Sequence, residues 1–119
     1  MVTSDLSARI NDVLRYVGIT RNMNAYMILS QALTLIAEDE DRLRAVEKEI
    51  YKPIADKTLR GPRAVQSTVR RASKVAWDFF PDRVQELAGY PLNGRPSAVT
   101  MLELLYNGVA RYDDLSILK

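Results

Sequence analysis

The sequence predicts an all-α domain of about six helices with an embedded helix-turn-helix. Three observations support this. Apolar residues recur at steps of three and four along most of the chain, which is the period of an amphipathic helix, and no segment of useful length has the period of a strand. Proline and glycine stand where helices are expected to begin and end. The 119 residues, 47% of them hydrophobic, suit one globular domain over residues 1–119.

The first half of the chain is expected to form three helices. The first carries an apolar stripe and ends at Gly18; the stripe consists of Leu6, Ile10, Val13, Leu14 and Val17. Residues 22–41 form a long central helix that is apolar on more than one side, and the acidic run 38–41 marks its end. A third helix carries Leu43, Val46, Ile50 and Tyr51. Pro53 then kinks this helix or begins a new one.

The second half is expected to contain the longest well-patterned helix. Gly61 and Pro62 are typical of a turn followed by a helix start, and the apolar spacing then continues to about residue 79. A short helix over about 82–88 ends at Gly89, and residues 90–96 form a loop. Ser97 is a suitable N-cap for the last helix.

The positive charge of the chain is concentrated in one window. The net charge is only +2, with 17 basic and 15 acidic residues. Residues 56–75 hold six basic residues against one acid, Asp56, which is a local net charge of +5. The segments on either side are slightly acidic. A basic stripe on an otherwise near-neutral domain is typical of binding to a phosphate backbone.

This window also has the layout of a helix-turn-helix over about 53–79, in which the second helix lies in the major groove and meets base edges. Residues on its outer face near its start are expected to read bases: Arg63, Gln66, Ser67 and Arg70. Neighbouring basic residues are expected to bind DNA phosphates, which set the register without reading sequence: Lys57, Arg60, Arg71 and Lys74. The pattern alone leaves double-stranded DNA and a protein partner both open.

The composition argues against an enzyme. Without cysteine or histidine, the chain has no thiol nucleophile, no thiolate metal site and no histidine base. It also has no glycine-rich phosphate loop, so we expect no catalytic residues, no metal and no cofactor. The start resembles no secretory signal and no apolar run is long enough for a membrane span, so we expect a cytoplasmic protein.

Scattered but collinear residues resemble one known family, the C-terminal DNA-binding domain of the sporulation response regulator, stage 0 sporulation protein A. The similarity is nearly ungapped from about Val17 to Trp77 and weaker to about Tyr112. The matching residues are Val17-Gly18-Ile19, Tyr26, Leu29, Ala32, residues 48–51, Ile54-Ala55, Val65, Arg70, Ala72, Val75-Ala76-Trp77, Gly89-Tyr90 and Pro96.

The resemblance implies a six-helix fold with a recognition helix at about 62–79 and control of transcription from short DNA boxes. It also implies head-to-tail tandem copies or a homodimer on DNA, and contact with RNA polymerase. The family carries this domain behind a phosphoacceptor receiver domain, and we expect no receiver here because the sequence before the match is short.

The recognition helix departs from the family at its base-reading positions. The family's Glu-Arg pair falls on Gln66-Ser67 and its preceding Arg falls on Ala64, while Arg70 keeps its type. An amide and a hydroxyl in place of a charged pair imply a different preferred sequence. The alternative is a protein-interaction module that keeps the fold, has lost operator reading, and modulates a transcription factor or polymerase.

Overall fold

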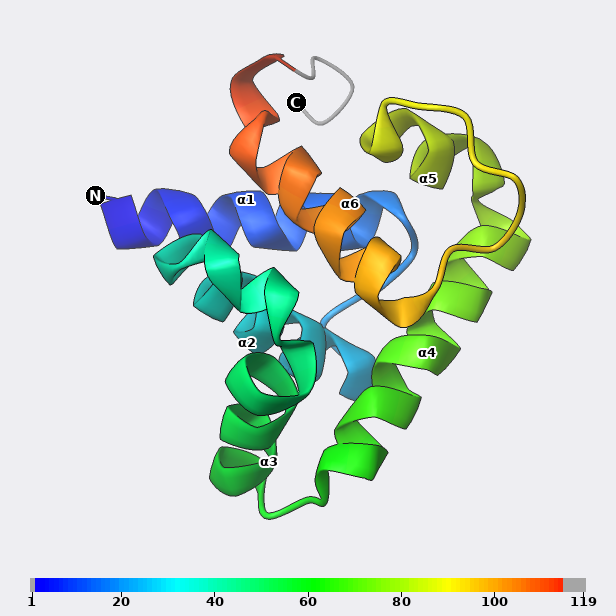
Figure 1. Ribbon diagram of the computed structural model, residues 1–119. Coiled ribbons are helices and arrows are strands. Elements are labelled where there is room, and N and C mark those ends of the chain that lie inside the picture. The colour runs from blue at the N-terminus through cyan, green and yellow to red at the C-terminus, as the bar shows by residue number, and fades with distance from the viewer. Residues whose placement is uncertain (1, 115–119) are drawn as a thin grey trace.

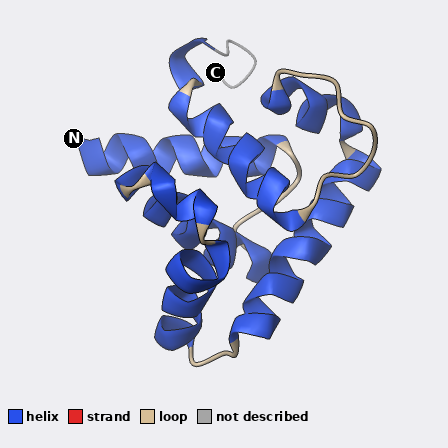
Figure 2. Cartoon of the chain, in the orientation of Figure 1, coloured by secondary structure: helices blue, strands red, loops and turns tan. Residues whose placement is uncertain are grey.

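The computed structural model describes residues 2–114, and in this range the chain is all-α, as the sequence predicts (Figures 1 and 2). Six α-helices carry the fold: α1 (Val2–Tyr16), α2 (Asn24–Glu38), α3 (Lys52–Thr58), α4 (Pro62–Phe79), α5 (Pro81–Ala88) and α6 (Ala98–Ala110). Three short turns of helix complete it: η1 (Glu40–Arg44), η2 (Glu47–Tyr51) and η3 (Tyr112–Asp114). No helix between residues 2 and 114 is both long and apolar enough to cross a membrane.

Helix α2 is the centre of the packing, as its broad apolar surface predicts. It packs against α1, α4 and α6, and it also contacts α3 and both turns that follow it. Its buried residues are Ile28, Leu29, Ala32, Leu33 and Ile36. Burying aliphatic side chains of this size contributes about 1.5–3 kcal/mol each, so α2 is a large part of the core's stability.

Two irregular turns replace the regular third helix that the sequence predicts around residues 43–51, and Pro53 begins a new helix, α3, which is one of the two predicted alternatives. The Asp39 side chain accepts a hydrogen bond from the Asp41 amide at 3.0 Å, which ends α2 and begins the 3-10 turn η1. A π-helical turn, η2, then runs directly into α3. Pro53 has no N–H to donate to the carbonyl of Glu49, and Nη1 of Arg42 donates to that oxygen instead, at 3.3 Å. The side chain of Arg42 therefore satisfies the carbonyl that Pro53 leaves without its usual helical donor.

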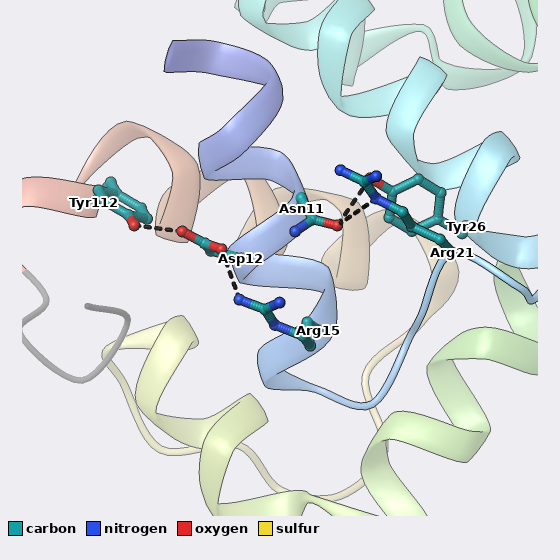
Figure 3. A network of polar contacts seen from close by, with 6 residues as sticks. All are labelled: Asn11, Asp12, Arg15, Arg21, Tyr26 and Tyr112. Carbon is teal, nitrogen blue, oxygen red and sulfur yellow. Dashed lines mark hydrogen bonds and ion pairs between the residues drawn. The ribbon is translucent and has the colours of Figure 1, made fainter. Parts of the chain in front are cut away.

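Polar contacts bind α1 to both the start of α2 and the end of the described chain (Figure 3). The Tyr112 hydroxyl and Nη2 of Arg15 both donate to the Asp12 carboxylate, the latter at 3.0 Å. On the next residue, Oδ1 of Asn11 accepts from Arg21 at 3.2 Å and from the Tyr26 hydroxyl at 3.1 Å. These contacts fix the rotation of α1 while its apolar stripe enters the core.

The turn after α1 predicts a stability test. Gly18 has a φ of +86°, and a Cβ there would lie 2.5 Å from a ring carbon of Phe80. Gly18→Ala should therefore lower the free energy of unfolding by about 2–3 kcal/mol, partly from backbone strain and partly from displacing the ring. In a Phe80→Ala background, the cost of the same change should fall to about 1 kcal/mol, the backbone part alone. Equal costs in the two backgrounds, measured by urea denaturation, would contradict the steric explanation.

The turn between α3 and α4 predicts a substitution that raises the stability of the protein, whereas the change at Gly18 lowers it. Leu59 adopts a left-handed conformation (φ 58°, ψ 30°) and its side chain is 94% exposed. A residue with a Cβ is strained there by about 1–2 kcal/mol, and an exposed side chain offers little packing in return. Leu59→Gly should raise the free energy of unfolding by about 0.5–1 kcal/mol after the larger chain entropy of glycine is included. Leu59→Val is the matched control and should lower the stability, because a β-branched residue fits this conformation worse.

Candidate nucleic-acid interface

Two helices and a short turn present the basic window of the chain. Helix α3 ends at Thr58, residues 59–61 form the turn, and α4 begins at Pro62. Gly61 is extended (φ −75°, ψ 154°), which is the conformation that a residue before proline prefers. The two helices pack against each other and are joined by the turn (Figure 1). Lys57 at the end of α3 lines a pocket beside α2, with Thr34 and Glu38, while the other basic residues of the window lie in the turn and on α4.

The inner face of α4 is anchored in the core. Its buried residues are Val65, Thr68, Val69, Ala72, Ser73 and Ala76. The two buried hydroxyls are satisfied: Thr68 donates to the carbonyl of Ala64 and Ser73 to the carbonyl of Pro96, each at 3.0 Å. The second bond connects the middle of α4 to the loop before α6. The rotation of α4 about its own axis is therefore set from within the protein.

The predicted base-reading residues do not all share one face. Arg63 and Arg70 are exposed and Ser67 is half-buried, and their spacing of four and three residues places them in one row along the outer surface of α4. Gln66 is also half-buried, but it lies about a quarter of a turn away and lines a cleft beside the helix. The structure thus groups three of the four on the outer face and puts Gln66 at its margin.

The predicted phosphate-binding residues are all exposed. Lys57 lies on the last turn of α3, Arg60 in the turn, and Arg71 and Lys74 on α4. Nζ of Lys74 donates to the Asp78 carboxylate at 2.6 Å, and both side chains are about half-exposed. An exposed pair of this kind contributes only a few tenths of a kcal/mol, so a DNA phosphate can compete for the lysine. The i, i+4 spacing of this pair is visible in the sequence, but the sequence analysis missed it.

A cleft of about 430 Å³ lies on the flank of α4, and the sequence analysis missed it. Eleven residues line it: Val46, Glu47, Tyr51, Gln66, Arg70, Ser73, Arg95, Pro96, Ser97, Ala98 and Val99. They come from η2, from α4 and from the loop and first turn of α6, which are separated by up to about fifty residues in the chain. No spacing signal connects such segments, so local pattern could not have found this site.

Tyr51 is the unusual residue of this cleft. It belongs to the buried core, with only 3% of the residue exposed. Its hydroxyl is buried without a hydrogen-bond partner in the structure. Burial raises the pKa of Tyr51, Arg70 opposes this shift and Glu47 adds to it, so both charged groups are close enough to act on the hydroxyl.

Two aromatic residues at the end of α4 differ in their exposure. Trp77, which the sequence places in the core, is only partly buried and packs against the edge of the core. Phe79 is 73% exposed. Within the described residues, no group of three histidine, cysteine, aspartate or glutamate side chains could hold a metal ion.

The match to a known family covers most of this architecture. Residues 10–109 match the family model Spo0A_C, described as sporulation initiation factor Spo0A C terminal. The matched range contains α2, α3, α4 and α5 entirely and nearly all of α6. Both helices of the basic surface and the cleft beside them therefore lie inside it.

Proposed function

The chain belongs to the Spo0A C-terminal family, a family of DNA-binding regulatory domains of sporulation rather than enzymes, and from this premise we propose that α4 is its recognition helix. In this proposal, α3 and α4 form the helix-turn-helix over about 53–79, and α4 enters the major groove of double-stranded DNA. The protein reads a specific operator and regulates transcription in the cytoplasm.

One observation carries the proposal: the exposed surface of α4 is cationic over its first four turns. From Pro62 to Val75 the helix contains four basic residues and no acidic one, and all four basic side chains are exposed. Arg60 adds a further exposed cation in the turn that leads into α4. The core holds the opposite face of α4, so these cations are held together where a polyanion can reach them.

The roles of individual residues follow from their places on α4. Arg63, Ser67 and Arg70 lie on the outer row and Gln66 on its margin, where side chains of a groove-bound helix reach base edges. Lys57, Arg60, Arg71 and Lys74 surround them and bind phosphates. We include in the proposal the tandem or dimeric binding on DNA and the contact with RNA polymerase that the resemblance implies.

A second candidate is a protein-interaction module that has lost operator reading. The observation that favours it is the exposed Phe79, together with Val75 one turn earlier, which is 37% exposed. A large aromatic side chain in solvent at the end of the proposed recognition helix suits a protein contact. The two candidates differ in whether duplex DNA binds with sequence preference.

The cationic surface predicts a steep salt dependence. Each neutralised phosphate contributes a slope of about −0.9 to log K against log salt, so four to six cations imply a slope of roughly −3 to −5. Fluorescence anisotropy with a labelled duplex between low and physiological salt measures this slope. Absence of binding at low salt, or binding independent of salt, would favour the interaction module.

Residues that contact bases and residues that contact phosphates should differ in how their substitution changes the affinity for DNA. The test compares a high-affinity duplex selected from a random pool with a scrambled duplex. Gln66→Ala and Ser67→Ala should each weaken binding to that duplex by about 1–3 kcal/mol and binding to a scrambled duplex far less. Lys74→Ala should weaken both about equally and reduce the salt slope by about one.

Asp78→Asn is the matched control for the lysine. It frees Lys74 from its carboxylate partner and should strengthen binding to both duplexes. If Gln66→Ala and Ser67→Ala both leave the ratio of the two affinities unchanged, α4 does not read bases.

A further inference from the structure

We propose that the cleft beside α4 is a phosphate-binding site, built by Tyr51, Arg70, Arg95 and the first turn of α6. The phosphate comes from the DNA backbone beside the groove that α4 enters, or from a small phosphate ion or ester. Only the first of these sources rests on the proposed function. Each supporting observation comes from a different element of the fold.

The buried hydroxyl of Tyr51 is the first observation. The residue is 3% exposed, lines the cleft, and has no hydrogen-bond partner for its hydroxyl in the structure. Leaving a buried hydroxyl unsatisfied lowers stability, so a phenylalanine would be the more stable choice for packing alone. A phosphate oxygen is an acceptor that this O–H can bond.

The charge of the cleft is the second observation. Arg70 and Arg95 line it with one carboxylate, that of Glu47, which leaves a net charge of +1. Both arginines are exposed, so their guanidinium groups are free to turn toward a ligand, and a guanidinium matches the geometry of a phosphate in a bidentate contact. Arg70 lies both on the outer row of α4 and on the wall of the cleft, so its guanidinium can reach a phosphate at the edge of the base-reading surface.

The start of α6 supplies the third observation, which is two backbone amides without an intrahelical partner in residues that line the cleft. The Thr100 amide is satisfied by the Ser97 hydroxyl at 3.2 Å and the Met101 amide by the Ser97 carbonyl at 2.8 Å. The amides of Ala98 and Val99 are the remaining first-turn donors, and both residues line the cleft. α6 has 13 residues, and the N-terminus of a helix of this length attracts an anion through its amides and its dipole. Ser73 holds this turn against α4 through the carbonyl of Pro96.

Two variants remove parts of the site with little effect on the fold. Tyr51→Phe deletes only the unpartnered hydroxyl, so its melting temperature should equal or exceed that of the wild type. Arg95→Gln changes an exposed loop residue. The controls are Tyr16→Phe, a half-buried tyrosine outside the cleft, and Arg111→Gln at the opposite end of α6.

The first arm titrates inorganic phosphate into the ¹⁵N-labelled protein and follows the amide signals of Ala98 and Val99. The wild type and both controls should show saturable shifts. Tyr51→Phe and Arg95→Gln should each weaken phosphate binding about tenfold, the equivalent of one hydrogen bond to a charged group. Glu47→Gln should strengthen it, because the competing carboxylate charge is removed.

The second arm measures binding of duplexes in which single phosphates are replaced by neutral methylphosphonates. If the ligand is a backbone phosphate, neutralising the phosphate at one position of the duplex should weaken binding by the wild type but not by Arg95→Gln. If inorganic phosphate binds while the affinities of both variants for unmodified duplex equal those of the controls, the ligand is a free phosphate.

The inference and the proposed function fail separately. If phosphate produces no saturable shift, and both variants bind duplex as tightly as the controls, the phosphate site is overturned while DNA binding stands. If no duplex binds, but inorganic phosphate shifts the amide signals of Ala98 and Val99 and the phosphate affinities of the variants follow the predicted order, DNA binding is overturned. The cleft then stands as a site for a small phosphate.

Discussion

The packing of α4 against α2 is the contact on which the rest of the surface depends. Both helices place their apolar faces in one core, where Val65, Val69 and Ala76 of α4 and Leu29, Leu33 and Ile36 of α2 are fully buried. A core at native density tolerates little rotation of a helix, because each buried side chain fits its neighbours. Packing of the apolar face of α4 therefore fixes the direction in which its polar residues point.

The exposed side of α4 has an electrostatic cost in the free protein. Arg70 and Lys74 are like charges four residues apart, a spacing that destabilises an isolated helix by about 0.2–0.5 kcal/mol. Asp78 relieves part of this repulsion one turn further along. Apolar burial in the core outweighs such a cost many times over, so the fold can maintain a concentration of cations that only a polyanionic partner fully neutralises.

The cleft, like the like-charged surface of α4, holds a feature that lowers the stability of the free protein. Tyr51, whose buried hydroxyl is unsatisfied, lines this cleft together with two arginines and the first turn of α6. Such features are expected at functional sites, because they lower stability without any gain in packing. Gln66 and Arg70 line the cleft on the margin of the proposed recognition surface, so a phosphate bound there would lie next to DNA bound at that surface.

Local signals in the sequence were sufficient for most of the helical layout. Pro62 and the spacing of Val65, Val69, Ala72 and Ala76 predicted α4 with the bounds that the structure has, and Ser97 was correctly identified as the cap of α6. Interactions within a few residues decide such features. The irregular turns between α2 and α3 were missed: Asp39 caps the first, and Arg42 supplies a donor to the Glu49 carbonyl from seven residues away, which a periodic apolar pattern does not record.

By itself, the sequence determined the fold class, the position of the basic window and the family resemblance. The first two depend on local spacing and charge, and the third on residues whose order along the chain is enough to identify it. Only the tertiary structure decided that Gln66 lines a cleft together with Tyr51, and that Arg95 and Arg70 line the same cleft. These arrangements depend on how α4, η2 and the start of α6 pack together. That packing is a property of the whole core, and no local periodicity records it.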